Sequence, residues 1–282
     1  MYKLVDISQM PMKYLVRSFI ILILLWKSTL SIAQEQTPDS LLINYKDAIT
    51  DSAQLESLRQ ILNYWKYFPS DSTIYYSKAL IKKSVETDQL SKAYKGYYWL
   101  TNTMTNLGYS DSTIYFAFQG LNLFKSDTTY LYPQSILLLI IGEEYRAIEK
   151  FEEALKYLNQ AWELSQKSSR PESQVGIANR IAACYHESRE HDLALYWADS
   201  SLKLGAVYNN SSYVLKSLDI KASVLRDQGK LEEALKLFKT AFENADNEIM
   251  KIGTLNNIAS TYIKLEDFQK VVEFAQTSFE MS

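Results

Sequence analysis

The chain has 282 residues, of which 47% are hydrophobic, so it is long enough to bury a large core in one elongated domain or two compact ones. Its formal net charge of −3 excludes the strongly basic character of nucleic acid-binding proteins. The single cysteine, Cys184, excludes an intrachain disulfide and a thiolate metal cluster, and we expect it to be a small buried hydrophobic residue.

Residues 1–33 have the features of a signal peptide. A positively charged segment (13–17) precedes an apolar run (19–26), and Ser31 and Ala33 are small residues at the −3 and −1 positions of a cleavage site. The apolar run is too short to span a bilayer, which takes about 20 residues. We therefore predict cleavage after Ala33 and export to the periplasm or the extracellular space. An uncleaved membrane anchor is the alternative.

An N-terminal packing segment is predicted for residues 34–49, because the stretch 38–49 (PDSLLINYKDAI) resembles a short helix. Met12 is as good a start as Met1, since residues 1–11 add nothing that a signal peptide needs.

The hexapeptide SDSTIY occurs at residues 70–75 and again at 110–115, and it belongs to a longer repeat. A ladder of mostly small residues recurs at intervals of 40, 41, 40, 40 and 37 positions, at Thr73, Thr113, Ala154, Ala194, Ala234 and Val271. A second set lies 12 positions before the last five of these, at Thr101, Gly142, Ala182, Ala222 and Ala259. The constant gap predicts pairs of helices that cross closely at small side chains.

Apolar residues recur with the helical period around both sets, so each unit is predicted to be a helical hairpin. Other predicted packing positions are Tyr75, Tyr115, Tyr145, Ala161, Tyr185, Ala241 and Tyr262. A glycine inside a helix costs about 1 kcal/mol relative to alanine, so Gly142 favours a close approach of two backbones. Gly108 and Gly229 instead lie where helices should end.

These positions resemble the pattern of the tetratricopeptide repeat family, which has small residues at repeat positions 8, 20 and 27. The segments 137–164 and 215–245 resemble it most clearly, and the likeness covers residues 50–282. The resemblance implies an all-α, right-handed α-solenoid of about six hairpins, centred near residues 73, 113, 154, 194, 234 and 271.

The period near 40 residues is longer than the usual 34 of the family. It is similar to long-period versions found in extracytoplasmic parts of bacterial signalling proteins. Because the 12-residue gap is constant, the extra residues must lie in longer helices or in longer turns between repeats. The segments 167–173 (KSSRPES) and 205–213 (GAVYNNSSY) are predicted to be such turns.

The last predicted helix leaves Val271, Phe274 and Phe279 without a following repeat to cover them. Truncation of a longer chain is the favoured explanation, and a partner or second copy that covers this end is the alternative.

The sequence offers little sign of catalytic chemistry, because it contains no glycine-rich phosphate loop and no nucleophile elbow. His186 and His191 are five residues apart, a spacing that does not place two metal ligands on one helix face, so we expect both to be solvated. Acidic pairs at 152–153 and 232–233 open second helices, where carboxylates favour the positive end of the helix. We expect no enzyme, no cofactor and no metal.

The resemblance implies that the first helix of each hairpin lines a concave groove, chiefly through repeat positions 5, 9 and 12. The groove candidates carried over in this way are Tyr98, Asn102, Glu143, Arg146, Asn179, His186, Asp219, Arg226 and Asn256. A face that is merely solvated is the alternative for these positions.

We therefore expect an exported scaffold or sensor module that binds a protein or peptide, such as the N-terminal sensory part of a bacterial signal-transduction protein. A self-assembling structural protein that uses its C-terminal repeat is the first alternative, and a non-catalytic subunit of an enzyme complex is a distant one. Partner identity, oligomeric state and any regulatory ligand do not follow from the sequence.

Overall fold

The computed structural model describes residues 38–65 and 70–282, and the predicted signal peptide lies outside these residues. The chain divides into two compact units, Met1–Tyr64 and Trp65–Ser282. Helices account for most of the described residues, which contain no strand. The all-α class predicted from the sequence is confirmed.

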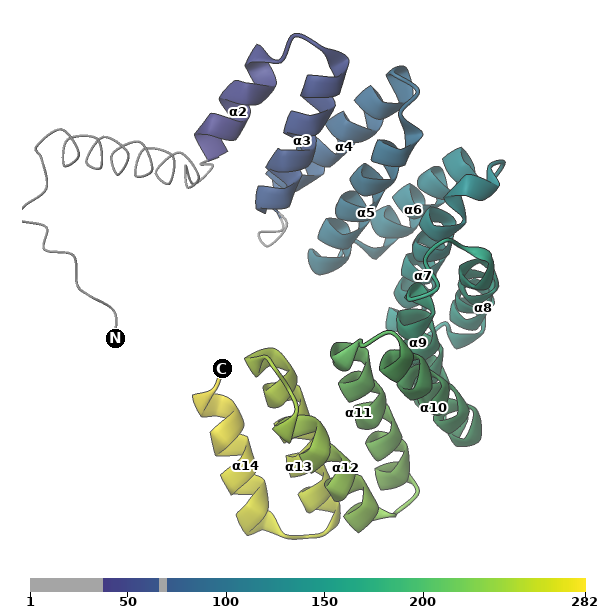
Figure 1. The fold of residues 1–282 in the computed structure, drawn as a ribbon. Helices are drawn as coiled ribbons and strands as arrows, with labels where there is room; N and C mark the ends of the chain where they lie inside the picture. Colours follow the sequence, from purple (N-terminus) through teal and green to yellow (C-terminus); the bar gives the residue numbers. More distant parts are fainter. Residues whose placement is uncertain (1–37, 66–69) are drawn as a thin grey trace, which may run out of the picture. The chain divides into compact units, whose positions relative to one another are not determined.

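Two helices begin the described part of the chain (Figure 1): α2 (Pro38–Asp47) and α3 (Asp51–Trp65). The first of them lies within the predicted N-terminal packing segment. On α3, an apolar stripe of Leu55, Leu58, Ile61 and Leu62 is fully buried.

The second unit consists of helices that follow one another as pairs joined by short turns (Figure 1). Their bounds are α4 (Asp71–Glu86), α5 (Leu90–Asn106), α6 (Ser110–Phe124), α7 (Leu131–Ala147), α8 (Phe151–Lys167), α9 (Ser173–Glu187), α10 (His191–Val207), α11 (Ser211–Asp227), α12 (Leu231–Glu243), α13 (Glu248–Lys264) and α14 (Phe268–Glu280). A 3-10 turn, η2 (Thr128–Tyr130), precedes α7. The odd-numbered helices α5 to α13 are the first helices of hairpins, and the even-numbered helices that follow them are the second helices. Helix α4 carries the ladder residue Thr73 and is counted as a second helix too.

The hairpins close through three-residue turns that share one backbone conformation. The middle residue of each has a positive φ angle: Gly108 (77°), Glu149 (59°), Arg189 (65°), Gly229 (80°) and Glu266 (59°). The next N–H then donates to a carbonyl five residues back, as Lys230 does to Leu225 at 2.9 Å. This is the Schellman motif, which satisfies carbonyl groups at the end of a helix. Gly108 and Gly229 end their helices as predicted.

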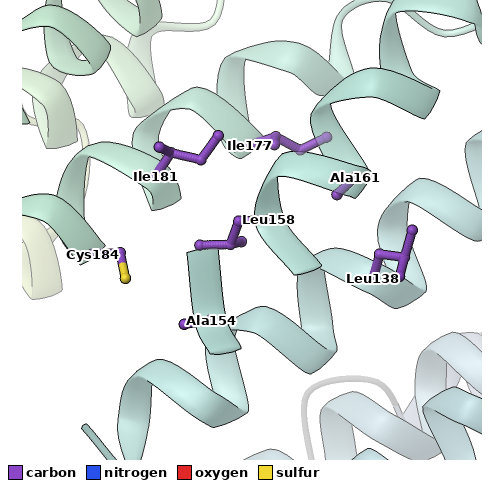
Figure 2. Packing of buried hydrophobic residues seen from close by; sticks show 7 residues of the cluster. All are labelled: Leu138, Ala154, Leu158, Ala161, Ile177, Ile181 and Cys184. Atoms are coloured by element: carbon purple, nitrogen blue, oxygen red, sulfur yellow. The ribbon is translucent and has the colours of Figure 1, made fainter. Parts of the chain in front are cut away.

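Small side chains lie where the paired helices cross. A Cβ atom added to Gly142 would lie 2.7 Å from Leu158 and 3.1 Å from the carbonyl oxygen of Ala154, so α7 and α8 touch at this point. Ala154, Leu158 and Ala161 form one buried cluster with side chains of α7 and α9 (Figure 2). The other ladder residues are buried too, except Val271, which is half-buried. Ala222 of α11 and Ala234 of α12 belong to one buried cluster. The predicted close crossing is confirmed.

The extra residues of the long period lie mostly in helices. First helices run to 17 residues in α5, α7, α11 and α13, while the second helices α8 and α10 are also 17 residues long. The predicted turn at 167–173 is present as a connection over 168–172. The predicted turn at 205–213 is wrong in extent, because α10 continues to Val207 and α11 begins at Ser211.

Other packing predictions need correction. Tyr75 and Tyr115 lie on second helices and are 66% and 57% exposed, so they are surface residues rather than core residues. Tyr145 is half-buried and Tyr262 is buried, as predicted, and each stacks on an aromatic residue of its second helix. Phe274 is the partner of Tyr262, with ring centroids 5.5 Å apart, so it is packed rather than uncovered.

None of the helices in residues 38–65 and 70–282 has both the length and the apolar character needed to cross a bilayer.

Candidate functional site

All the predicted groove residues lie on the first helices α5, α7, α9, α11 and α13. We call the surface that these helices form together the first-helix face. Each of these helices contacts the first helix of the next hairpin, so side chains can reach from one repeat to the next. Polar links between repeats prove to be the main feature of this face.

Charged candidates join consecutive first helices. Arg146 of α7 donates to Glu187 of α9 at 2.5 Å, and His186 of α9 lies 3.1 Å from Asp227 of α11. Asp227 in turn accepts from Lys264 of α13 at 3.1 Å. His186 is therefore not the solvated histidine expected from the sequence, because its ring pairs with a carboxylate and its side chain is only 20% exposed.

Glu143 is the centre of a smaller ionic cluster. Its two carboxylate oxygens lie 3.0 Å from Arg146 and 3.2 Å from Arg180 of α9. Burial opposes the charge of Arg146, but the hydrogen bonds and charges of Glu143 and Glu187 outweigh it and raise the pKa of Arg146. The carboxylate of Glu143 thus forms ion pairs with two arginines.

Asn179 and Asp219 also link neighbouring first helices. Asn179 is only 2% exposed and donates to Ser217 of α11 at 3.0 Å, so it holds helices together and does not reach the surface. Asp219 accepts from the hydroxyl group of Thr254 at 3.2 Å. Burial raises the pKa of Asp219 to about 6, although the hydrogen bond from Thr254 and the charge of Arg226 oppose this shift.

The remaining candidates make more local contacts. Asn102 donates to the carbonyl group of Tyr98 one helical turn earlier, at 2.8 Å. Asn256 accepts from Ser278 of its own hairpin at 2.9 Å. Arg226 donates to Asn257 at 3.4 Å. Of these four candidates, Asn256 is exposed, whereas Tyr98, Asn102 and Arg226 are half-buried.

The sequence did not single out several side chains that the structure adds to this face. Tyr132 and Tyr213 lie in the first turns of α7 and α11, before position 1 of the repeat pattern, because the long period extends these helices at their N-terminal ends. Arg170 lies in the connection before α9, and Lys216 lies on α11. The unusually high tyrosine count of 21 was the only signal in the sequence.

Metal-binding residues do not gather in the part of the chain that the structure describes, since no group of three His, Cys, Asp or Glu side chains there could hold an ion. The rings of His186 and His191 are 6.4 Å apart. Cys184 is fully buried, and burial raises the pKa of its thiol to about 12, so it is the small hydrophobic residue expected from the sequence.

A family model described as the tetratricopeptide repeat matches residues 137–168, which span α7 and α8. No curated protein matches the chain in sequence.

Several solved structures have a similar fold at low sequence identity. BtubC (BKLC) from P. vanneervenii has a TM-score of 0.56 and 12% identity, and the match covers 86% of this chain and 91% of that one. The apo form of RapI has a TM-score of 0.54 and 14% identity, covering 94% and 92%. A signal-transduction ATPase with a tetratricopeptide repeat sensor, from Pyrococcus horikoshii, has a TM-score of 0.61 and 12% identity, covering 83% of this chain and 37% of that one. These likenesses show an all-α repeat solenoid, as predicted, and they show the fold alone.

Proposed function

We propose that the chain is a protein- or peptide-binding scaffold and that its partner contacts the first-helix face. The observation that carries this proposal is a contrast between constant and variable positions. The buried ladder positions are occupied by small or apolar residues in nearly every repeat. Position 5 of the first helices, by contrast, is occupied in turn by Tyr98, Leu139, Asn179, Asp219 and Asn256.

A regular frame with a varied face suits recognition of an extended partner, since each repeat can offer a different contact. Asn179 is left out of the direct contacts because its amide is buried between helices. Ionic links hold the side chains of Glu143, Arg146 and His186 in fixed orientations, which lowers the entropy lost when a partner binds.

Site-specific photo-crosslinking tests the proposal. A photoreactive amino acid is placed on first helices, at Asn102 or Ala183, and on second helices, at the exposed positions Lys156 or Lys236. The protein is expressed in its native cell and irradiated. We expect a discrete crosslinked partner from the first pair of positions and none from the second pair. Equal crosslinking on both faces, or none on the first helices, would contradict the proposal.

We also propose that the protein acts outside the cytoplasm, as a sensor or assembly module of a signalling system. The signal-like residues 1–33 support export. The solenoid of the Pyrococcus horikoshii signal-transduction ATPase serves that protein as its sensor, which makes a sensor role reasonable for this fold. N-terminal sequencing of the mature protein should begin at Gln34, and an intact N-terminus on protein in the cytoplasm would argue against export.

Self-assembly is the second candidate, and α14 supports it. Phe268 and Val272 of this helix are each 65% exposed, and Phe279 is 80% exposed. Leu235, at the position of α12 that corresponds to Val272, is instead buried in a cluster with residues of α13. Sedimentation velocity should then show association that is lost when Val272 and Phe279 are changed to Ser, and a concentration-independent monomer would eliminate this candidate.

A further inference from the structure

Three tyrosine side chains from separate first helices lie near one another on the first-helix face. The ring of Tyr94 of α5 lies 6.2 Å from that of Tyr98 and 5.7 Å from that of Tyr132 of α7. Tyr213 of α11 is far along the chain, but its hydroxyl group is near enough to Tyr98 to act on it electrostatically. Burial, and then the neighbouring hydroxyl groups of Tyr132 and Tyr213, raise the pKa of Tyr98.

The backbone and a fourth tyrosine hold this group in place. Tyr94 packs edge-on against Tyr132, with their ring centroids 5.7 Å apart. A Cβ atom at Gly176 would come within 2.8 Å of the Tyr213 hydroxyl, so the ring of Tyr213 can lie against α9 only because this residue has no side chain. The Tyr213 hydroxyl therefore lies against α9 at Gly176, and the Tyr132 ring is held against Tyr94 of α5.

Two cations lie on the faces of these rings. The guanidinium carbon of Arg170 is 5.0 Å from the ring centroid of Tyr132. The ammonium group of Lys216 is 4.9 Å from the ring centroid of Tyr213. Both distances are typical of cation–π contacts, which orient the charged groups beside the aromatic surface.

Among residues 38–65 and 70–282, no carboxylate lies within salt-bridge distance of Arg170 or Lys216. The nearby Arg180 shares Glu143 with Arg146. Burial, and then the charge of Arg180, lower the pKa of Lys216, while the charge of Glu143 opposes this shift.

We propose that the first-helix face binds an acidic peptide segment through a strip made by Tyr98, Tyr132, Tyr213, Arg170, Arg180 and Lys216. An incoming Asp or Glu side chain would relieve the repulsion between Lys216 and Arg180 and would accept hydrogen bonds from tyrosine hydroxyl groups. The half-buried rings would cover an apolar or aromatic side chain of the same segment, as tyrosines do in many interfaces. This inference rests on the proposed function and names the chemical class of the partner.

The test measures binding of fluorescein-labelled Glu–Tyr copolymer by fluorescence anisotropy, with Lys–Tyr copolymer of the same length as the opposite-charge probe. We expect the wild-type protein to prefer the Glu–Tyr probe. Changing Arg170 and Lys216 together to Gln should weaken binding of that probe by about tenfold, because two charged contacts are lost. The matched control, Lys236→Gln with Lys239→Gln, removes the same charge from exposed positions of α12 and should change binding by less than about twofold.

Other outcomes have definite meanings. Equal weakening by both double variants would show that only net charge matters and would overturn the inference, as would an equal affinity of the wild-type protein for the two probes. A third variant, Tyr213→Phe, keeps the ring and removes only one hydroxyl group, so its weaker binding would support the strip even if the Arg170 variant unfolds. If crosslinks map to the first-helix face while the Arg170 and Lys216 variant binds the Glu–Tyr probe normally, the proposed function stands and the acidic partner is wrong.

Discussion

Gly142 shows at the scale of single residues why a helix-disfavouring residue is retained inside a helix. The residue faces Leu158 and the backbone of Ala154, and no larger side chain fits between α7 and α8 without a shift of one of them. Gly253 of α13 is also inside a helix, but a Cβ atom there would meet nothing within 4 Å. Substitutions at these two glycines therefore distinguish the effect of packing on stability from the effect of helix propensity.

The change Gly142→Ala should lower the free energy of unfolding by about 1–3 kcal/mol, because it overpacks a buried crossing. The same change at Gly253 should raise it by about 0.5–1 kcal/mol, since only the propensity of alanine for helix acts there. Urea unfolding followed by circular dichroism measures both. Stabilisation of the protein by alanine at Gly142 would refute the close crossing of α7 and α8.

Asp219 gives a prediction about pH. Burial raises its pKa to about 6, so the folded state takes up a proton at a higher pH than the unfolded state, whose carboxyl group has a pKa of about 3.9. The penalty for burying its charge is therefore present above pH 6 and is relieved as the pH falls from about 6 to about 4. Asp219→Asn should raise the free energy of unfolding by about 1–3 kcal/mol at pH 7.5 and by much less at pH 4.

The difference between wild type and variant isolates Asp219 from other groups that titrate in this range. Asp227 acts with the opposite sign: its pKa is lowered because the hydrogen bonds and charges of Lys264, His186 and Arg226 outweigh burial. Its contribution to stability is lost only as the pH falls below the ordinary range of an aspartate. A stability difference that does not change between pH 7.5 and pH 4 would show that Asp219 is not buried as a charge.

Sequence reasoning worked at residues whose size is fixed by packing, such as Ala154 and Ala222, and failed at Tyr75 and Tyr115. A tyrosine is equally compatible with core and surface, because its ring is apolar and its hydroxyl group is polar. The helical period alone does not decide between these two environments.

At the scale of elements, the turn inside each hairpin is the most regular feature. The five turns that join the first and second helices of the hairpins from α5 to α14 all place their middle residue in the left-handed region. Only two of these middle residues, Gly108 and Gly229, are glycines. The non-glycine residues pay a conformational cost of about 1 kcal/mol each. The Schellman hydrogen bonds and the packed helices on both sides maintain the conformation.

Replacing Arg189 with Gly should therefore raise the free energy of unfolding by about 0.5–1 kcal/mol, because it relieves this strain. Gly229→Ala is the matched change in the opposite direction and should lower it by about 1 kcal/mol. Thermal unfolding of both variants checks the sign of each effect. If Arg189→Gly is destabilising, the side chain of Arg189 has a role that the turn geometry does not reveal.

Element lengths were harder to predict than element positions. The stretch 205–213 contains Gly, Asn and Ser and looks like a loop, but tertiary packing keeps 205–207 in α10. The extended first helices had a further consequence, because their added N-terminal turns carry Tyr132 and Tyr213. A pattern fitted to the usual period does not include these residues.

In the second unit as a whole, the buried packing positions are similar from hairpin to hairpin, whereas the residues of the first-helix face differ. We call the packed helices the frame. The frame was predictable from a sequence repeat, since each hairpin packs only on its neighbours and the contacts are local in sequence. The face was only partly predictable, because Tyr98 and Tyr213 belong to hairpins that do not pack on each other and yet are near enough to interact electrostatically. Such an approach depends on how several repeats stack, which no single repeat encodes.

Hydroxyl-radical footprinting of the tyrosines, with and without the crosslinked or co-purified partner, tests the central proposal most directly. The protein has tyrosines on both kinds of helix, and Tyr75, Tyr115 and Tyr196 on second helices are more than half exposed. We predict that the partner protects Tyr98, Tyr132 and Tyr213 from oxidation and leaves the three second-helix tyrosines unchanged. Protection of Tyr75, Tyr115 and Tyr196 without protection of Tyr98, Tyr132 and Tyr213 would place the binding surface on the second helices and contradict the account.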